Sequence, residues 1–331
     1  MFRRALLVMA VLAPLALILA ATAPAAQNLR YAHVGSEGDI QYWYGEEFGK
    51  RLPGWTGGRV TATVFPNSQM GGVQELIDGV KSGSLSMGHH QFSSLSRLVK
   101  NIAVFDGPFA YRDADHAMLA ASPGSPVLEE INQQLIKEGG MRIIGTLFRG
   151  ARQMTCKFPV YGPEDLKGKP FRGVPIPLWT TMIKGMGAIP TPVEVSELPT
   201  ALMTGMVVGQ ENPLTMINAN KLYEVQSHVM LTGHMQNVLP VFINEKAWQS
   251  ISEADRNAIL KGAAALGKET LEMAKKEEKD LVGELTKKGM TFITEKEGLK
   301  NDVFRKGVLE QVKIDYPEWP SYYEKIANIG K

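Results

Sequence analysis

The sequence predicts an α/β protein of two lobes, with mixed sheets flanked by helices and one long helix spanning both lobes. Three observations support this: strands and helices alternate at the spacing of βα units, the alternation restarts near residue 149, and residues 252–288 contain no proline. We expect a first lobe from residues 27–148 plus 240–331, which include the long helix and a C-terminal extension. Residues 149–239 form the second lobe.

The first 26 residues differ in composition from the rest of the chain. Two arginines precede an apolar run from Ala5 to Ala21, and small residues follow up to Ala26. This order is typical of a secretory signal peptide, so we expect cleavage after Ala25 or Ala26 and a periplasmic protein. An uncleaved membrane anchor is the alternative, but a run of about 17 apolar residues is shorter than the roughly 20 that a spanning helix needs.

Charge and cysteine content exclude several classes of partner. The chain has 36 Lys and Arg against 34 Asp and Glu, and two of the basic residues lie in the signal peptide. The mature chain is therefore close to neutral and has no basic patch that would indicate a nucleic-acid partner. The single cysteine, Cys156, has no partner for an internal disulfide and no CxxC motif, so we expect it to be simply packed.

The first lobe is expected to contain strands near residues 29–33, 59–65, 84–87 and 141–148, with helices between them. Ligands of such folds bind at the carboxyl ends of parallel strands. The loops after the first three strands therefore supply candidate residues, which are His33, Phe65, His90 and Gln91.

The second lobe repeats the pattern with strands near 155–160, 169–174, 189–193 and 207–211. The chain then returns to the first lobe through residues 231–244. Ser252 is a candidate N-cap for the long helix, whose charged face is expected to be solvated.

Arg172 and Asn212 lie forty residues apart, each at the end of a predicted strand. Two strand ends can meet at one cleft, and the planar guanidinium fork of an arginine matches a carboxylate. The pattern predicts a receptor for an organic acid. The alternatives are a surface arginine for Arg172 and a turn former for Asn212. For Trp179 and Phe65 we expect one of two roles: packing in the hydrophobic core, or forming an apolar wall over the ligand.

The sequence gives little support for a metal site, a cofactor site or an enzyme. His89 and His90 are adjacent, so in a strand they point to opposite faces, and no third ligand is suitably spaced. The chain has no GxSxG or HExxH motif, and the pair Gly185 and Gly187 lacks the third glycine of a dinucleotide loop. We expect a binding protein without metal or cofactor. An exported enzyme acting on an organic acid and a ligand-presenting partner of a sensor remain alternatives.

Several motifs carry a family resemblance over essentially the whole mature chain. In order, they are residues 65–72 (FPNSQMGG), 107–109 (GPF), 164–172 (EDLKGKPFR), 209–213 (GQENP) and 232–234 (TGH). The chain resembles the extracytoplasmic solute-binding proteins of tripartite ATP-independent periplasmic (TRAP) transporters, the DctP-like family. The resemblance implies two lobes of the periplasmic binding protein fold that close on a small organic acid and deliver it to a membrane permease.

The resemblance also implies roles for individual residues. The arginine at the position of Arg172 pairs bidentately with the ligand carboxylate, Arg152 commonly assists, and Asn212 bonds the same carboxylate. A structural ion pair within the second lobe is the competing interpretation of Arg152. Glu75 matches a first-lobe carboxylate that often contacts the ligand or holds the closed form, although it could simply be solvated.

The chain departs from the family pattern at four positions, which are Ser86, Val195, Pro199 and Val208. Aspartates are expected at two of them, a tyrosine at Pro199 and a ligand-packing aromatic residue at Val195. The departures leave the carboxylate clamp unchanged and put the rest of the pocket in doubt, so the resemblance does not identify the ligand.

Overall fold

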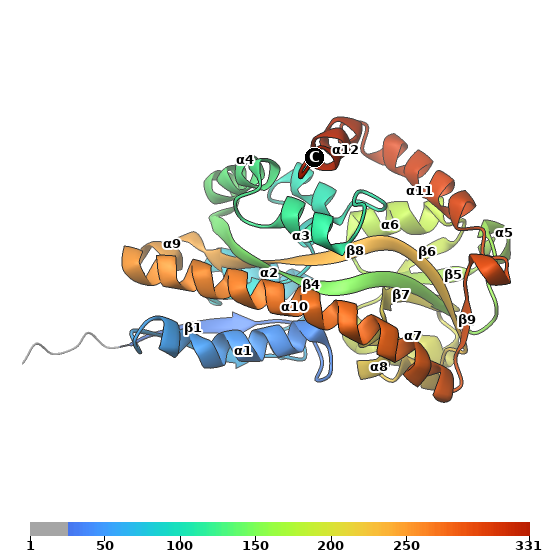
Figure 1. The fold of residues 1–331 in the computed structure, drawn as a ribbon, viewed down its shortest axis with the longest axis horizontal. Coiled ribbons are helices and arrows are strands. Elements are labelled where there is room, and N and C mark those ends of the chain that lie inside the picture. The colour runs from blue at the N-terminus through green and yellow to red at the C-terminus, as the bar shows by residue number, and fades with distance from the viewer. Residues whose placement is uncertain (1–25) are drawn as a thin grey trace, which may run out of the picture.

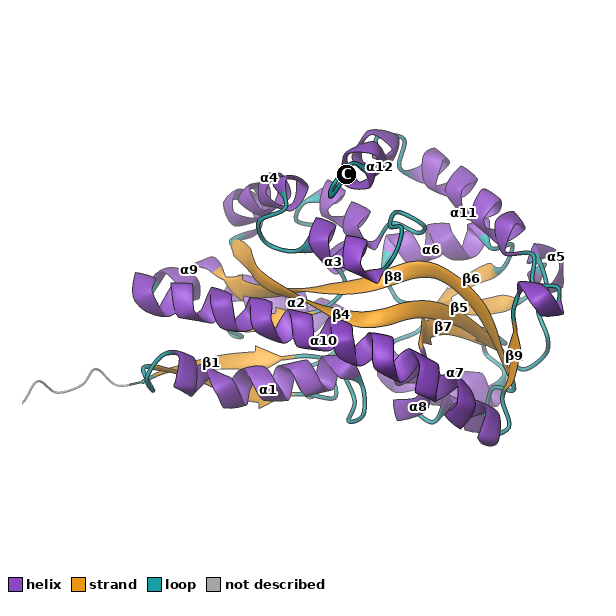
Figure 2. Ribbon diagram, in the orientation of Figure 1, coloured by secondary structure: helices purple, strands orange, loops and turns teal. Residues whose placement is uncertain are grey.

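The computed structural model describes residues 26–331, so the apolar run of the predicted signal peptide lies outside the described residues. A single mixed sheet of nine strands runs through this part of the chain and is flanked by helices (Figures 1 and 2), which confirms the predicted α/β class. No helix between residues 26 and 331 is both long enough and apolar enough to cross a membrane.

The strands follow the order β2-β1-β3-β8-β4-β7-β5-β6 across the sheet, and β9 pairs with β8. Their bounds are β1 Gln27–Ala32, β2 Val60–Phe65, β3 Met87–His89, β4 Met141–Cys156, β5 Pro170–Gly173, β6 Ile189–Pro192, β7 Gly209–Pro213, β8 His228–Asn244 and β9 Thr291–Ile293. Pairs within β1–β3 and within β5–β7 are parallel, whereas β3 pairs with β8, and β4 with β7 and β8, in antiparallel fashion.

The helices alternate with these strands along the chain. The α-helices are α1 Ile40–Trp55, α2 Val73–Ser82, α3 Ala114–Ala121, α4 Pro126–Gln134, α5 Pro163–Leu166, α6 Pro177–Gly185, α7 Leu198–Thr204, α8 Leu214–Ala219, α9 Glu245–Gln249, α10 Glu253–Lys287, α11 Asn301–Asp315 and α12 Trp319–Ala327. Short 3-10 or π segments are η1 Phe92–Leu95, η2 Lys100–Asp106, η3 Leu135–Gly139, η4 Val195–Glu197, η5 Leu222–Glu224 and η6 Glu295–Glu297. We call β1–β3 with α1 and α2 the first half of the molecule, and β5–β7 with α6 and α7 the second half.

Two long strands, β4 and β8, join the halves into one sheet. They have 16 and 17 residues and pair along their whole length, from Met141 opposite Asn244 to Cys156 opposite His228. The sequence predicts separate strands near 141–148 and 155–160, but β4 continues between them through a register shift around Gly150. Gly150 has a φ of 111°, which a glycine adopts without strain, so the strand bends there without ending.

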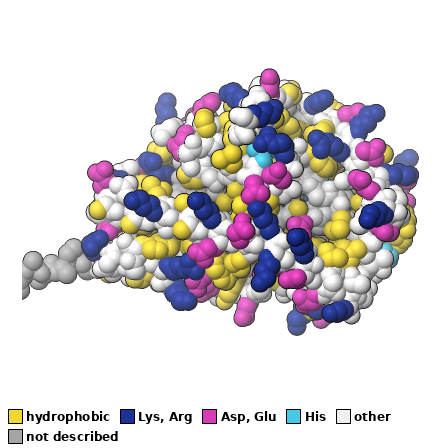
Figure 3. All heavy atoms as spheres, viewed as in Figure 1, with side chains coloured by type: hydrophobic (Ala, Val, Ile, Leu, Met, Phe, Trp, Pro, Cys, Tyr) yellow, Lys and Arg dark blue, Asp and Glu magenta, His cyan; other side chains and the backbone are white. Residues whose placement is uncertain are grey.

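The predicted long helix is present as α10, which has 35 residues and is therefore about 52 Å long. Ser252 caps it, since its side chain accepts a hydrogen bond from the Asp255 amide. The helix packs on β4, on α1 of the first half and on α8, which follows β7. Basic and acidic side chains are interspersed on the face where α10 crosses the molecule (Figure 3). Lys275 of α10 forms an ion pair with Asp115, with Nζ 2.7 Å from Oδ1.

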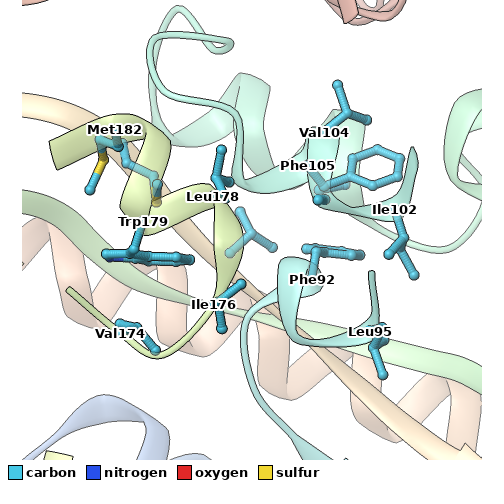
Figure 4. Packing of buried hydrophobic residues seen from close by; sticks show 14 of the residues in the cluster. Phe92, Leu95, Ile102, Val104, Phe105, Val174, Ile176, Leu178, Trp179 and Met182 are labelled. Carbon is cyan, nitrogen blue, oxygen red and sulfur yellow. The ribbon is translucent and has the colours of Figure 1, made fainter. Parts of the chain in front are cut away.

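The largest hydrophobic cluster connects the two halves. Figure 4 shows Ile176 and Leu178 between the ring of Trp179 on one side and that of Phe92 on the other. Phe92 also contacts Phe105, with ring centroids 4.9 Å apart. Burial of each such side chain contributes about 1.5–3 kcal/mol to folding, so this cluster anchors the segment between β5 and α6.

The C-terminal extension contacts both halves, although the sequence pattern assigned all of residues 240–331 to the first lobe. Helix α11 packs on α6, where Thr181 Oγ1 donates a hydrogen bond to Asp315 Oδ2 at 2.6 Å. Helix α12 returns to the first-lobe segment, where Tyr323 Oη donates to the Pro108 carbonyl at 3.0 Å. An amphipathic pattern predicts that a helix packs, but it does not say against which neighbour.

The contact between α6 and α11 depends on a close backbone approach at Gly185. A Cβ atom at this position would lie 2.5 Å from the Val308 Cα and 2.9 Å from the Gly307 carbonyl oxygen. We expect Gly185→Ala to lower the free energy of unfolding by about 1–3 kcal/mol, because the backbone of α11 must shift. Urea denaturation of the ligand-free protein measures this.

Gly283→Ala in α10 is the matched control. A Cβ there meets no atom within 4 Å, so this variant should be as stable as wild type or up to about 1 kcal/mol more stable. Equal unfolding free energies for Gly185→Ala and wild type would contradict the packing described for α6 and α11.

Candidate functional site

A cluster of buried polar side chains lies where β4 and β8 meet the ends of β5 and β7. It contains Arg152 of β4, Arg172 of β5, Glu211 and Asn212 of β7, and His234 of β8, none of them more than 3% exposed. The parallel strands β5 and β7 pair at Phe171 and Gly209, so Arg172 and Asn212 both follow this pair towards the carboxyl ends of the strands. Their joint contact with one ligand stays a prediction.

Arg172 is a buried cation with most of its hydrogen-bonding capacity unused. Its side chain is 2% exposed, and Nε donates to the Val193 carbonyl at 2.8 Å. Within residues 26–331, Nη1 and Nη2 have no hydrogen-bond acceptor and no carboxylate partner. Burial lowers the pKa of Arg172 to about 10, opposed by the charge of Glu211 and reinforced by that of Arg152. A buried charge without a partner is unfavourable, so this position favours an anion.

Arg152, in contrast, is already paired with a carboxylate. Nε and Nη2 donate to the two carboxylate oxygens of Glu211 at 2.5 and 2.7 Å. Nη2 also reaches Asn212 Oδ1 at 3.1 Å, and Nη1 donates to Asn237 Oδ1 at 3.1 Å. Of the five guanidinium hydrogens, one on Nη1 is left. The competing interpretation, a structural ion pair, is therefore present, and the assisting role of Arg152 stays a prediction.

Glu211 is the residue that organises this cluster, and the sequence reasoning missed it. It accepts hydrogen bonds from Arg152 and from Trp179 Nε1 at 2.6 Å, and its Oε2 lies 3.0 Å from His234 Nε2. Burial raises the pKa of Glu211, but attraction to Arg152 and the hydrogen bonds to Arg152 and His234 together lower it to about 2. The carboxylate is ionised under all ordinary conditions.

Trp179 and Asn212 are held by the same network. Trp179 is fully buried, its indole N–H is used by Glu211, and its ring lies 5.3 Å from the Arg152 Cζ, so the structure places it in the core behind the arginines. Asn212 Nδ2 donates to Gln210 Oε1 at 2.6 Å while its oxygen accepts from Arg152. This fixes the amide orientation and leaves one N–H of Asn212.

The first half contributes uncharged polar groups. His90 and Gln91 follow β3 and are each 4% exposed, and His90 Nδ1 and Gln91 Oε1 have no partner in the described part of the chain. Burial lowers the pKa of His90 to about 3, with further lowering by Arg149, Arg152 and Arg172. His90 is therefore a neutral imidazole close to the arginine cluster.

His33 packs against α1 and His89, and its contact with a ligand stays a prediction. Its Nδ1 accepts a hydrogen bond from the Gly35 amide at 3.1 Å, and its Nε2 points at α1, where a Cβ on Gly45 would lie 2.5 Å away. Its ring stacks on His89 at 4.7 Å. Burial lowers the pKa of His33 to about 4, so it is a neutral packing residue in the first half.

Phe65 and Glu75 lie nearer the surface. Phe65 is half-buried, with the Arg30 guanidinium 5.6 Å from its ring centroid. Glu75 is exposed in the first turn of α2, and its aliphatic part packs against Gly71. Contact of either residue with a ligand stays a prediction.

A second buried ion pair, also missed by the sequence reasoning, joins β4 to the start of α1. Arg149 Nε donates to Asp39 Oδ1 and Oδ2 at 2.9 and 3.0 Å, and Asp39 also accepts from the Gln41 amide as the N-cap of α1. The available signal was weak, because an aspartate before a helix and an arginine in a strand each have common surface roles. Their mutual burial depends on the path of β4.

The described residues show no arrangement suited to metal binding. Between residues 26 and 331 no group of three or more His, Cys, Asp or Glu side chains could hold a metal ion. Cys156 is buried, and its Sγ contacts the Val208 carbonyl at 3.3 Å. The chemistry that the cluster offers is recognition of an anion, with Arg172 as a cation that no carboxylate of residues 26–331 contacts directly.

Comparison with known proteins places the chain in a family. Residues 31–312 match the family described as bacterial extracellular solute-binding protein, family 7 (DctP). A solute-binding protein of Roseobacter denitrificans is 33% identical over 83% of this chain and 84% of its own length. The 2,3-diketo-L-gulonate-binding periplasmic protein YiaO of Escherichia coli is 29% identical over 82% of each chain.

A solved structure agrees with this assignment. The crystal structure of a TRAP periplasmic solute-binding protein from Roseobacter denitrificans with bound L-galactonate superposes with a TM-score of 0.83 at 30% identity, covering 92% of this chain and all of that one. The chain therefore belongs to family 7 of the bacterial extracellular solute-binding proteins, the solute-binding proteins of TRAP transporters, and is a binding protein rather than an enzyme.

Proposed function

We propose that this chain is a periplasmic receptor that binds a small organic acid between its two lobes, with Arg172 as the group that pairs with the ligand carboxylate. The observation that carries the proposal is the buried Arg172 guanidinium, whose Nη1 and Nη2 have no partner among residues 26–331. These two nitrogens form the planar fork that a carboxylate accepts bidentately.

The remaining clamp residues play smaller parts in this proposal. Arg152 offers its last Nη1 hydrogen and Asn212 its last Nδ2 hydrogen, while Glu211 holds both residues in place. Arg152 is thus mainly a positioning residue, and a single arginine supplies the unpaired charge. One carboxylate neutralises the single positive charge of Arg172. We therefore propose that the ligand places one carboxylate, and not two, at Arg172.

The ligand body is proposed to be polyhydroxylated. His90 and Gln91 carry buried, uncharged and unpartnered atoms, and the charges of Arg149, Arg152 and Arg172 act on His90. Such atoms pair with hydroxyl groups. The relative from Roseobacter denitrificans binds L-galactonate in its crystal structure, and the Escherichia coli relative is named for 2,3-diketo-L-gulonate. Both molecules are six-carbon sugar acids, which is the class we propose for this chain.

Closure of the lobes would occur about the two crossing strands. We take residues 27–148 with 240–331 as one lobe and 149–239 as the other, except that α11 moves with the second half because it packs on α6. Register shifts in β4 near Gly150, and in β8 opposite it, supply bends at the same level of both strands. A ligand that binds the closed form more tightly shifts the population towards closure.

The partner that we propose for the closed form is the membrane permease of a TRAP transporter. The proposal rests on the family, in which the soluble component serves such a transporter. Export through the signal peptide of residues 1–26 would place the mature chain in the periplasm. We propose no cofactor for this chain.

Substitution of Arg172 tests the carboxylate clamp. We expect Arg172→Ala to weaken binding by about 30-fold to several thousand-fold, and Arg172→Lys to bind poorly because a point charge does not reproduce the fork. The ligand-free variants should melt at or above the wild-type temperature, because burial already disfavours this charge. Calorimetry measures the affinities.

Arg97→Ala is the control, since Arg97 is an exposed arginine of the first half. The ligands are L-galactonate, 2,3-diketo-L-gulonate, succinate and L-galactono-1,4-lactone, which lacks the free carboxylate. Mass spectrometry of acids released from freshly purified, denatured protein extends the panel. Arg172→Ala affinity within threefold of wild type contradicts the clamp, and tighter binding of the lactone than of L-galactonate contradicts carboxylate recognition.

Glu211→Gln tests the positioning network. Removing one partner of a buried ion pair leaves Arg152 uncompensated, so we expect unfolding to become easier by about 3–5 kcal/mol. The folded-state pKa of Glu211 is lowered to about 2, so its ionised form stabilises the fold above about pH 4.5 and this contribution is lost as the pH falls towards 2. The variant should show a smaller loss of stability over that window.

Urea denaturation at several pH values between 2 and 7 measures both effects. Glu164→Gln is the control, because its ion pair with Lys300 is exposed and should contribute almost nothing. A Glu211→Gln variant with wild-type stability and an unchanged pH dependence would show that the pair does not organise the site.

A further inference from the structure

Glu194 reaches from the second half of the molecule to the first. It lies between β6 and η4 and is half-buried, with its carboxylate seated against Gly72 at the start of α2. A Cβ atom on Gly72 would lie 2.9 Å from Glu194 Cδ and Oε1 and 3.1 Å from Oε2. Gly72 therefore leaves space that the carboxylate occupies.

The start of α2 is suited to hold this carboxylate. Its N-cap residue, Gly72, has no side chain to pair with the first amides of the helix. Burial raises the pKa of the Glu194 carboxyl, and the charge of Arg172 and the Val73 backbone N–H partly oppose that rise by stabilising the ionised form. A negative charge at a helix N-terminus is favourable, so the Glu194 carboxylate, which comes from the opposite half of the molecule, lies in a stabilising position at the start of α2.

Glu194 is also directly connected to the proposed ligand site. Arg172 Nε donates to the carbonyl of Val193, the residue before Glu194, and the charge of Arg172 lowers the Glu194 pKa. Glu75 and Glu197 act in the opposite direction, because their like charges raise it. Arg172 and the start of α2 thus both attract the same carboxylate.

We propose that Glu194 is an interlobe latch that holds the closed form by capping α2, and that the ligand controls it through Arg172. This inference rests on the proposed function. Without a ligand, the charges of Glu211 and Glu194 both attract Arg172, and of these two carboxylates only Glu211 is bound by Arg152. A ligand carboxylate on Arg172 replaces that attraction, which leaves Glu194 to cap α2 and favours closure.

Two substitutions on opposite sides of the contact test the latch. Gly72→Ala keeps every charge but places a methyl group where the Glu194 carboxylate lies, and Glu194→Gln keeps the size but removes the charge. We expect each to weaken L-galactonate binding roughly 3- to 30-fold, the range of an N-cap interaction. Small-angle scattering at equal L-galactonate concentration should show a larger radius of gyration for both variants than for wild type.

The double variant separates a latch from independent effects. Both substitutions break the same contact, the one between Glu194 and the start of α2. The affinity of the double variant for L-galactonate should therefore be at most about twofold lower than that of the single variant that binds it more weakly. Gly54→Ala, where a Cβ meets no atom within 4 Å, and Glu197→Gln, an exposed neighbour of Glu194, should bind as wild type does.

Three outcomes would overturn the latch. They are wild-type affinity of both single variants, multiplied effects in the double variant, and a loss confined to Glu194→Gln, which would make Glu194 a direct ligand contact. If wild type binds none of the acids, the proposed function fails separately. The latch is then judged by scattering of ligand-free Arg172→Ala, in which Arg172 no longer competes with α2 for Glu194, with and without Gly72→Ala, and identical radii of gyration overturn it.

Discussion

The buried ion pair between Arg152 and Glu211 is the interaction on which the site depends. It compensates the charge of one of two neighbouring arginines, and it orients Asn212 and Trp179 through hydrogen bonds to the same groups. Arg172 is left as a buried cation without a carboxylate of its own. A protein interior tolerates such a charge poorly, and a partner that arrives with the ligand relieves it.

The crossing strands explain why a compact sheet can also be a two-lobed receptor. Strand β8 pairs with β3 of the first half, β4 pairs with β7 of the second half, and the two strands pair with each other through register shifts near Gly150. The arginine cluster lies at that level, so a rotation about the bends would change the distance between Arg172 and the first-half residues His90 and Gln91. Recognition and closure are therefore coupled through the same few strand residues in the function we propose.

Most of the fold was predictable, and the side-chain partners were not. The alternation of strands and helices, the long helix α10 and the family resemblance all follow from local pattern and motif order, and the structure and comparisons confirm them. The continuity of β4 through Gly150 was missed, because a bulge resembles a strand end in the sequence. Glu211 and Asp39 were missed because the type and position of a single charged residue do not indicate which residue it pairs with.

The sequence alone was sufficient to identify an α/β solute-binding protein of TRAP transporters, since strand periodicity, helix length and ordered motifs are local properties. Only the tertiary structure showed which of the two arginines has a carboxylate partner and which has none within residues 26–331. Arg152 and Arg172 are the same residue type in similar strand contexts, and their difference comes from Glu211, which lies 59 residues from one and 39 from the other. The pairing of a carboxylate with one of two arginines depends on distance and burial in three dimensions, and the spacing of residues along the chain determines neither.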